Sequence, residues 1–482
     1  MLFYDILLRD KEKFGDKIAL QSEKEVCTYS QLFRMVMNAV GYLKKVGGKR
    51  DKVLLCSNNS LELVVAYFAS VFAGKILLFV DPKYNEELKN IIVEYQVNFY
   101  VLDRNSESKV KDILSENKNI PNVFVDINDL LTCSDLDVAE EVEITRGIEK
   151  MNPNDPAVII FTSGTEGLPK GVVNSQKTLL EACNNYVETC HVSESDRFLG
   201  VTPFFHSYCM GSCMLASLYS GAYIYTMKSF VPGKVLKIIE QHNITIFQGV
   251  PFMYELMLRN RLLSNLSKLR LCITAGGKIA DEMIDRIHAL TGVWLINEYG
   301  SSETGTIAIN YPPNQPYITG KVLDGVMVKL ENVNKKGIGR LAVKSKGLFL
   351  GYWNQEEVCR EYYLTGDLVK MLGKNMILIL GRCNDIVSIS GLKVNIKEVE
   401  NIILKYSKVR DCLVSKRENS AFGECLEAMI VPENDDINES EIREFCSKHL
   451  AKYKIPAYIS FIKEIKRSAL GKRVYQERDN NK

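Results

Sequence analysis

A loop rich in glycine and hydroxyl side chains follows a strongly apolar run of the chain. The run AVIIF at 157–161 leads directly into TSGTEGLPKG at 162–171. Glycines let the backbone bring N–H groups close to an anion, and the hydroxyls and the lysine add donors and positive charge. This combination predicts a phosphate cradle, with an ordinary turn after a buried strand as the alternative. The residues expected to contact phosphate are Thr162, Ser163, Gly164, Thr165, Gly167 and Lys170.

The loop differs from the P-loop motif G-x-x-x-x-G-K-[ST] at two positions. Pro169 stands where the second glycine should be, and Gly171 stands where the magnesium-binding hydroxyl should be. A kinase or a P-loop nucleotide hydrolase is therefore disfavoured.

Four further motifs follow the loop along the chain. They are NEYGSSETG at 297–305, YLTGD at 363–367, GRCND at 381–385 and GK at 471–472. With the loop, they make the chain resemble the acyl-adenylate-forming (AMP-binding) superfamily, closest to acyl-CoA and aryl-CoA ligases. Luciferases and the adenylation domains of peptide synthetases belong to the same superfamily. The resemblance begins at CTYSQL, residues 27–32, which is similar to the family's LTYxEL.

The resemblance implies a reaction in two steps. A fatty or aryl acid attacks the α-phosphorus of ATP and expels pyrophosphate, and a thiol then takes the acyl group from the acyl-adenylate. The implied cofactors are ATP, Mg²⁺ and CoA, or the phosphopantetheine of a separate carrier protein. The residues implied to be catalytic are Thr162, His206, Glu303 and Lys472.

The motif NEYGSSETG supplies most of the implied nucleotide site. Tyr299 would stack on adenine, Asn297 would lie near the purine edge, and Ser302 would donate to a phosphate. Glu303, with Thr162, would coordinate Mg²⁺, a hard ion that prefers oxygen ligands. The neighbouring positions also counted as nucleotide-binding are Gly276, Gly277, Lys278, Glu298, Gly300 and Ser301.

The later motifs complete the implied machinery. Asp367 would accept hydrogen bonds from both ribose hydroxyls, and Arg382 would reinforce the ribose from the domain junction. Lys472 would bridge the carboxylate and the α-phosphate in the adenylation transition state. Lys393 is also counted as nucleotide-binding.

The chain departs from the family pattern at a few positions. Glu166 stands where Thr or Ser is common; it is counted as cofactor-binding, and its role stays open. At the implied hinge, Asn384 replaces the usual Asp or Lys. Ser388 stands at a frequent Lys, and Lys393 stands where Arg is often found.

The substrate acid is implied by TPFFHSY at 202–208, which resembles the PLFHxxG segment of acyl-CoA ligases. Amino-acid-activating domains usually place an aspartate just beyond an aromatic here, and no acid follows Phe204 before Gly211. The acid is therefore expected to lack an α-amino group. The stretch VPFMY at 250–254, similar to VPTMY, supports the same subclass. The residues expected to border the acid are Phe205, His206, Tyr208, Met210, Ile273, Gly276 and Gly300.

Several alternatives stay open. The runner-up to a CoA ligase is a freestanding adenylase that loads a carrier protein. A catalytically silent binding protein on the same scaffold is remote, because such a protein has no chemical need for Lys170, Glu303, Asp367 and Lys472 together. A luciferase-like oxygenase has no discriminating feature, and His206 by itself could be a core histidine.

Short apolar runs alternate with longer amphipathic stretches in the first part of the chain. The runs at 53–56, 76–80, 99–102, 123–125 and 157–161 read as buried strands, and 29–46 and 231–242 as helices, the first capped by Thr28. This alternation predicts an α/β fold with parallel-rich sheets covered by helices.

The residue pattern along the chain changes twice in its second half. From about 318 short strands separated by glycine turns predict a small β-barrel-like part. After Arg382 a helix at 396–406, strands near 409–415 and 426–431 and a helix at 439–451 predict a small mobile α+β domain. The expected domains are 1–381 and 387–482, joined by a hinge at 382–386.

Composition limits the partner. The 482 residues carry a formal net charge of +2, so nothing favours nucleic acid or an anionic membrane, and the partner is expected to be small. The 13 cysteines are scattered without zinc-ligand spacing. The start MLFYDILLRDKEKFG lacks a basic n-region, and the apolar stretch 63–80 is expected to be a buried helix followed by a strand rather than a membrane span. A cytoplasmic protein is predicted.

Overall fold

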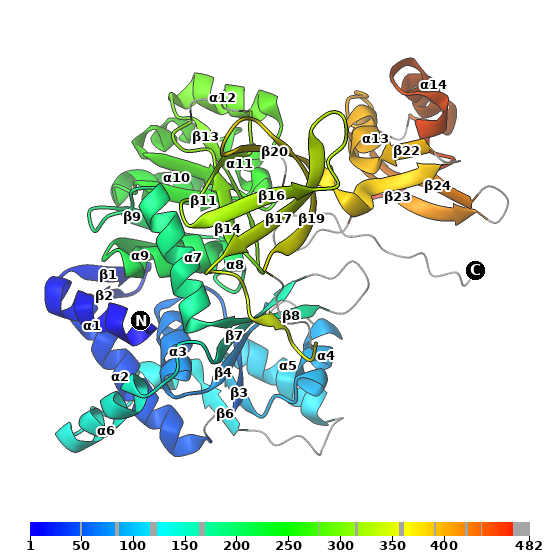
Figure 1. The fold of residues 1–482 in the computed structure, drawn as a ribbon. Helices are drawn as coiled ribbons and strands as arrows, with labels where there is room; N and C mark the ends of the chain where they lie inside the picture. The colour runs from blue at the N-terminus through cyan, green and yellow to red at the C-terminus, as the bar shows by residue number, and fades with distance from the viewer. Residues whose placement is uncertain are drawn as a thin grey trace. The chain divides into compact units, whose positions relative to one another are not determined.

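The structure is a computed structural model of the chain. It describes residues 1–48, 51–81, 86–115, 123–162, 169–277, 279–313, 317–355, 361–389, 392–419, 423–434 and 436–465. They form two compact units, the first comprising Met1–Val328 and Val343–Tyr363, and the second Lys329–Ala342 and Leu364–Lys482 (Figure 1). The predicted α/β class is confirmed, with large N-terminal and small C-terminal parts; the hinge at 382–386 stays a prediction.

The first unit contains a long mixed sheet. In the spatial order given next, each strand from β13 to β1 runs parallel to its neighbour. Antiparallel strands flank this parallel part at both ends. In spatial order they are β15 (Gly320–Val322), β14 (Gly305–Ile309), β13 (Leu295–Ser301), β12 (Leu271–Thr274), β11 (Ile246–Gly249), β9 (Arg197–Gly200), β10 (Tyr223–Thr226), β1 (Ile18–Gln21) and β2 (Val26–Thr28).

A second sheet of the same unit contains the strands that the apolar runs predicted. Its central pairs are parallel, and β7, β8 and β18 are antiparallel to one another. In spatial order the strands are β18 (Gly351–Tyr352), β8 (Lys170–Ser175), β7 (Pro156–Thr162), β4 (Ile76–Phe79), β3 (Lys52–Cys56), β5 (Phe99–Leu102) and β6 (Val123–Asp126).

Helices cover both sheets, and α7 packs against strands of each (Figure 1). The α-helices of this unit are α1 (Phe3–Phe14), α2 (Tyr29–Val46), α3 (Leu61–Phe72), α4 (Glu86–Glu94), α5 (Arg104–Ser115), α6 (Val138–Glu149), α7 (Gln176–Thr189), α8 (Ser207–Cys209), α9 (Ala216–Tyr219), α10 (Pro232–Gln241), α11 (Pro251–Met257) and α12 (Asp281–Thr291). The shorter turns are η1 (Ile127–Leu131), the π-helical η2 (Met210–Leu215) and η3 (Leu263–Lys268).

Local sequence explains two of these helices. Helix α2 begins after Thr28, whose side chain accepts from the Gln31 N–H while the Gln31 side chain accepts from the Thr28 N–H. Helix α3 is buried almost all round and is followed by β4, as predicted for the stretch 63–80. No helix among the described residues is long and apolar enough to cross a membrane.

The second unit holds its own strands and core. Its elements are β16 (Val326–Glu331), β17 (Ile338–Ser345), β19 (Tyr363–Met371), β20 (Met376–Arg382), η4 (Cys383–Asp385), β21 (Ile386–Ile389), β22 (Leu392–Asn395), α13 (Ile396–Ile403), β23 (Val409–Asn419), β24 (Gly423–Pro432), α14 (Glu439–His449), η5 (Lys452–Lys454) and β25 (Tyr458–Phe461), of which β16, β17 and β19 extend into the first unit. The amphipathic face of α13 packs against β23 and buries Val399 and Ile403 in a core cluster that also contains residues of β24. The predicted α+β character of this part is confirmed.

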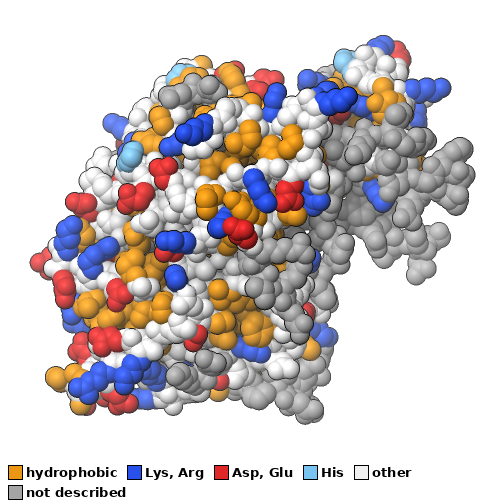
Figure 2. Space-filling model, in the orientation of Figure 1, with side chains coloured by type: hydrophobic (Ala, Val, Ile, Leu, Met, Phe, Trp, Pro, Cys, Tyr) orange, Lys and Arg blue, Asp and Glu red, His pale blue; other side chains and the backbone are white. Residues whose placement is uncertain are grey.

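Surface charge agrees with the composition. Basic and acidic side chains are interspersed over the described part of the face shown in Figure 2. This mixture fits the small formal net charge of +2.

Candidate active site

The two ends of the glycine-rich loop lie on adjacent antiparallel strands. Strand β7 ends at Thr162, β8 begins at Lys170, and the register pairs these two residues. The Thr162 hydroxyl donates to the Lys170 carbonyl at 3.5 Å. Residues 163–168 lie outside the described residues, so the roles of Ser163, Gly164, Thr165, Glu166 and Gly167 stay predictions.

Tyr352 links the loop to Glu303. The Lys170 Nζ lies 5.7 Å from the centroid of the Tyr352 ring, and the Tyr352 hydroxyl donates to Glu303 Oε1 at 2.8 Å. Tyr352 is held in place because β18 pairs with β8, opposite Val172. Burial, the Glu303 carboxylate and the Tyr363 hydroxyl raise the pKa of Tyr352, so its hydroxyl remains a donor. The lysine predicted to bind phosphate and the carboxylate predicted to bind a cation are thus joined through one aromatic side chain.

The oxygen donors at this place fit magnesium that arrives with a polyphosphate. Among the described residues no cluster of three or more His, Cys, Asp or Glu side chains could hold a metal by itself. Mg²⁺ is usually bound through one or two carboxylates together with substrate phosphates and waters. The Glu303 carboxylate and the Thr162 hydroxyl are hard oxygen donors of this kind.

The motif 297–305 forms the hairpin between β13 and β14. A Cβ on Gly300 would lie 2.2 Å from the Gly305 carbonyl oxygen, so this crossing requires glycine. Tyr299 is half-buried, and the Asn297 side chain donates to the Ile318 carbonyl at 3.3 Å. The turn is closed by the Ser301 N–H, which donates to the Thr304 hydroxyl at 3.1 Å.

The segment predicted to border the acid lies beside this hairpin. The hydroxyls of Ser207 and Ser302 are 2.9 Å apart, which ties the start of α8 to the motif. The His206 and Phe205 ring centroids are 4.7 Å apart, and the Tyr208 hydroxyl donates to the Gly249 carbonyl at 3.3 Å. The structure therefore brings the predicted acid-binding segment and the predicted phosphate ligand Ser302 together.

Other predicted residues near β12 and β13 are placed differently. Gly276 has φ of 81°, a conformation that favours glycine, and Gly277 follows it, whereas Lys278 lies outside the described residues. Met210 and Ile273 are buried in the core. Glu298 is also buried, and its Oε1 accepts from the Thr306 hydroxyl at 2.7 Å.

Asp367 and Arg382 form a cross-strand pair within the second unit. They are opposite each other on β19 and β20, and Arg382 Nε lies 2.9 Å from Asp367 Oδ1. The Asp367 side chain is 7% exposed and the Arg382 side chain 57% exposed, so the carboxylate is buried and the arginine faces solvent. The backbones of Lys393 and Ser388 pair across β21 and β22, but the structure does not describe their side chains. Lys472 lies outside the described residues.

Sequence reasoning missed two residues that the geometry brings into the site. Tyr352 contacts both Lys170 and Glu303, and Ser207 contacts Ser302. The aromatic pair in GYW at 351–353, directly after an apolar run, was the signal that could have indicated Tyr352. Ser207 gave no signal beyond its position next to His206.

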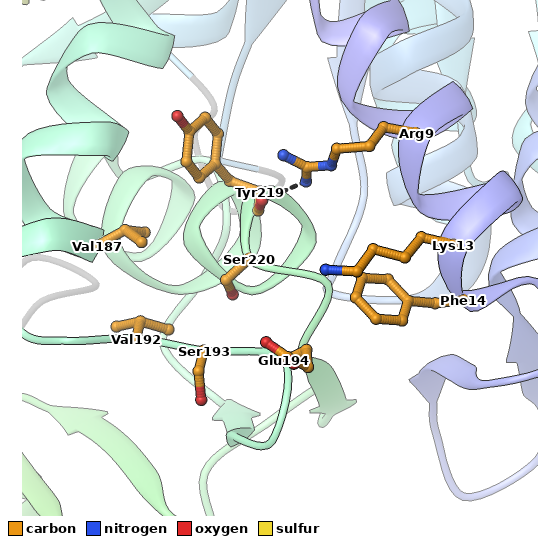
Figure 3. Close-up of a pocket in the computed structure, with 9 residues that line it drawn as sticks. All are labelled: Arg9, Lys13, Phe14, Val187, Val192, Ser193, Glu194, Tyr219 and Ser220. Atoms are coloured by element: carbon orange, nitrogen blue, oxygen red, sulfur yellow. Dashed lines mark hydrogen bonds between the residues drawn. The ribbon is translucent and has the colours of Figure 1, made fainter.

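One surface hollow lies away from these residues. It has a volume of about 240 Å³ and is lined by α1 and by the segments around Val192 and Tyr219 (Figure 3). Arg9 points into it and donates to the Tyr219 carbonyl. None of the predicted site residues lines this hollow.

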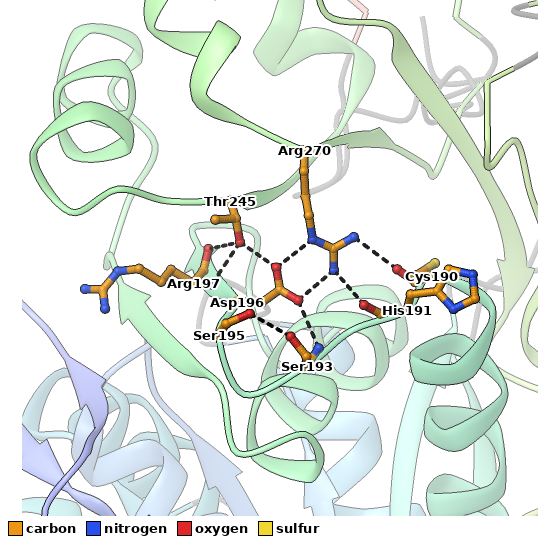
Figure 4. Close-up of polar contacts among 8 residues, drawn as sticks. All are labelled: Cys190, His191, Ser193, Ser195, Asp196, Arg197, Thr245 and Arg270. Carbon is orange, nitrogen blue, oxygen red and sulfur yellow. Dashed lines mark hydrogen bonds and ion pairs between the residues drawn. The ribbon is translucent and has the colours of Figure 1, made fainter.

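An ion pair with a buried carboxylate and a partly exposed arginine holds the strands that lead to the site. Arg270, just before β12, donates through Nε and Nη2 to the two oxygens of Asp196, each at 2.6 Å (Figure 4). Arg270 also donates to the Cys190 carbonyl at the end of α7, and the Thr245 hydroxyl donates to Asp196. Burial would raise the pKa of Asp196, but the hydrogen bonds from Arg270 and its neighbours outweigh it and lower that pKa. The cluster fixes β9, β11 and β12 relative to α7.

Comparison with known families covers nearly the whole chain. Residues 7–353 match the AMP-binding enzyme family, and residues 398–472 match the AMP-binding enzyme C-terminal domain.

Individual relatives are similar over almost their full lengths. The long-chain-fatty-acid–CoA ligase of Bacillus subtilis is 26% identical, over 97% of this chain and 92% of its own. The malonate–CoA ligase of Arabidopsis thaliana is 25% identical, over 95% of this chain and 85% of its own. Among solved structures, o-succinylbenzoate CoA synthetase from Bacillus subtilis, in complex with ATP and magnesium ion, has a TM-score of 0.83 at 21% identity, covering 97% of this chain and 98% of that one. At this identity the structural likeness shows the fold.

Proposed function

The chain belongs to the AMP-binding enzyme family, and we propose that it is an AMP-forming ligase that joins a carboxylic acid to the thiol of CoA. The observation that carries the proposal is the contact from Lys170, at the start of the strand that follows the glycine-rich loop, through Tyr352 to Glu303. The contact supports the proposal because it joins the lysine proposed to bind phosphate to the carboxylate proposed to bind the metal.

In the first step an oxygen of the carboxylate forms a bond to the α-phosphorus of ATP, and the bond between that phosphorus and pyrophosphate breaks. Lys170 and the backbone N–H groups of the loop stabilise the charge of the departing pyrophosphate. Glu303 and Thr162 would hold Mg²⁺, and the ion would neutralise phosphate charge there. Tyr299 stacks on adenine, and Lys472 stabilises the transition state between the carboxylate and the phosphorus.

In the second step the thiol sulfur forms a bond to the acyl carbon, and the bond from that carbon to the AMP oxygen breaks. The named relatives are CoA ligases for acids as different as malonate and long-chain fatty acids. These relatives favour CoA over a carrier protein as the thiol substrate. Because their acids differ so widely, the acid that this chain activates must be inferred from its own residues. The described cysteines are all free, which agrees with our proposal that the reaction takes place in the reducing cytoplasm.

A panel of carboxylic acids tests this function. Each acid is incubated with ATP and Mg²⁺, first with CoA and then with purified carrier proteins, and AMP, pyrophosphate and thioester are measured. We expect acid-dependent AMP and pyrophosphate, with acyl-CoA as the second product. ADP and orthophosphate as products, or thioester with carrier proteins alone, would contradict the proposal.

Changing Tyr352 to Phe removes the hydroxyl that positions Glu303. We expect the Mg²⁺ concentration for half-maximal pyrophosphate release to rise several-fold, in line with about 1 kcal/mol for one hydrogen bond, while the aromatic ring still contacts Lys170. Tyr363→Phe is the matched control, because it removes a neighbouring hydroxyl, 3.0 Å from that of Tyr352, and leaves the bond from Tyr352 to Glu303 in place. Identical magnesium titrations for Tyr352→Phe and the parent would contradict a positioning role.

Changing Asp367 to Ala removes the carboxylate proposed to bind both ribose hydroxyls. We expect ATP binding, measured by isothermal titration calorimetry, to weaken by about 10-fold or more, as for hydrogen bonds to a charged group. Asp436→Ala in the same unit is the control, because that side chain is 96% exposed. If Asp367→Ala weakens the binding of ATP and of adenine, which lacks the ribose, by the same factor, the proposed contact of Asp367 with the ribose is wrong.

A further inference from the structure

Two buried side chains of the first unit each leave one oxygen with no hydrogen-bond partner among the described residues. They are Gln248 on β11, which is 1% exposed, and Glu298 on β13, which is 7% exposed. The atoms concerned are Gln248 Oε1 and Glu298 Oε2. Leaving a buried acceptor without a partner is energetically costly, so two such acceptors in one region call for an explanation.

Strand register places the two side chains on one face of the sheet. Gln248 pairs with Ile273, and Ile273 pairs with Ile296. Directly paired residues of parallel strands share a face, and so do residues two apart on one strand. Glu298 is two residues after Ile296, so it extends the row that begins at Gln248.

Contacts with η2 support this placement. The Gln248 Nε2 donates to the Ser212 carbonyl at 2.8 Å and to the Tyr186 hydroxyl at 2.9 Å. Because a carbonyl only accepts, the amide nitrogen must face Ser212, and Oε1 is the free acceptor. The Ser212 hydroxyl also lies close enough to Glu298 to lower its pKa partly. Ser212 thus borders both side chains.

The same segment reaches the residues proposed to border the acid. Ser212 lies four residues after Tyr208 in the chain. The Tyr208 hydroxyl donates to the carbonyl of Gly249, the residue after Gln248. A Cβ added at Gly211 would meet no described heavy atom within 4 Å, so there is open space beside this turn. π-Helical turns such as η2 are frequent at functional sites.

The chemistry of the two oxygens defines what they can receive. Gln248 Oε1 accepts only, and Glu298 Oε2 accepts when the carboxyl is ionised. Burial raises the pKa of Glu298 to about 7, with the hydrogen bond from Thr306 and the nearby Ser212 hydroxyl, which itself donates to the Tyr208 carbonyl, acting in the opposite direction. A group that donates a hydrogen bond would favour the ionised form, and an apolar group would leave both oxygens unsatisfied.

We propose that the acid activated by this enzyme carries an N–H or O–H donor on the part remote from its carboxylate, and that Glu298 and Gln248 accept from that donor. The inference rests on the proposed ligase function and narrows its substrate class from any fatty or aryl acid to amino- or hydroxy-substituted acids. A site built to bind such a group rejects the analogue without it, because its buried acceptors are then left unpaired.

Matched acids test the inference. Pyrophosphate release is measured with para-aminobenzoate and para-hydroxybenzoate against para-toluate, and with ω-amino and ω-hydroxy alkanoates against the unsubstituted alkanoate of equal length. We expect kcat/KM to favour the donor-bearing acid by about 10-fold or more in at least one series, as for a hydrogen bond to a charged group. The amino and hydroxy members distinguish the two donors.

Variants assign the preference to Glu298. Glu298→Leu removes the acceptor and is expected to abolish the preference for the donor-bearing acid, whereas Glu298→Gln keeps the shape but loses the carboxylate charge and should reduce that preference, most for the amino-substituted acid. Glu282→Gln on the exposed part of α12 is the control. Thermal unfolding identifies a variant that fails to fold, in which case Glu298→Gln decides.

Equal kcat/KM within every matched series of the parent enzyme would overturn the inference, and so would a preference that both Glu298 variants leave unchanged. A failure of the proposed ligase function is recognised separately, because the enzyme would then release no pyrophosphate with any acid. Calorimetric binding of the same acids in the presence of a non-hydrolysable ATP analogue then tests the preference for a donor without turnover: tighter binding of the donor-bearing acids supports it, and equal binding overturns it.

Discussion

Replacing Lys472 by alanine is expected to lower acyl-adenylate formation by about 100-fold or more, as for the loss of one preorganised transition-state contact. Its ammonium is proposed to bridge the attacking carboxylate and the α-phosphate, where charge is shared only during the reaction. ATP binding should therefore change little. The measurement is the single-turnover rate of pyrophosphate release, with ATP affinity determined by calorimetry on the same preparations.

Arg473→Ala is the matched control, because it removes a neighbouring positive charge from the same segment. Arg473→Ala should leave the rate of pyrophosphate release and the ATP affinity close to those of the parent. An unchanged rate of pyrophosphate release in Lys472→Ala would refute the transition-state role. An equal loss of rate in both variants would mean that the segment contributes only its overall positive charge.

Replacing Arg270 by alanine is expected to lower the free energy of unfolding by about 3 kcal/mol, the lower end for breaking a buried ion pair from one side. The Asp196 side chain is 4% exposed and would be left with no opposite charge from Arg270, while the Arg270 side chain is 32% exposed, which argues against a larger value. The measurement is unfolding in urea followed by circular dichroism.

Arg270→Lys tests the geometry of this ion pair separately from its charge. Lysine keeps the positive charge but cannot reproduce the two parallel hydrogen bonds, so an intermediate loss is expected. Lys45→Ala, which breaks an exposed ion pair with Glu140, should have no measurable effect. If Arg270→Ala unfolds at the same urea concentration as the parent, the cluster does not stabilise the sheet.

Periodicity predicted much of the architecture because burial leaves a direct trace in the sequence. The apolar runs became β3 to β7, and the helix expected at 29–46 has those limits. The expected helix at 396–406 ends at Ile403, because helix ends depend on local hydrogen bonds that composition does not reveal. The π-helical turn at 210–215 was invisible for the same reason.

The candidate site was predicted as a set of motifs and not as a set of contacts. Contacts such as that between Glu303 and Tyr352 join residues far apart in sequence, and no spacing rule reveals them. Glu298 shows the complementary difficulty. Its motif suggested a nucleotide contact, whereas strand alternation turns its side chain into the interior beside Ser212.

The central claim is that a carboxylate oxygen attacks the α-phosphorus of ATP, and an acid labelled with heavy oxygen in its carboxylate tests it most directly. When the thiol displaces AMP, the carbon–oxygen bond breaks, and the attacking oxygen stays on phosphorus. Mass spectrometry should therefore find one labelled oxygen in each AMP formed with acyl-CoA. Unlabelled AMP, or label in orthophosphate formed together with ADP, would contradict the account.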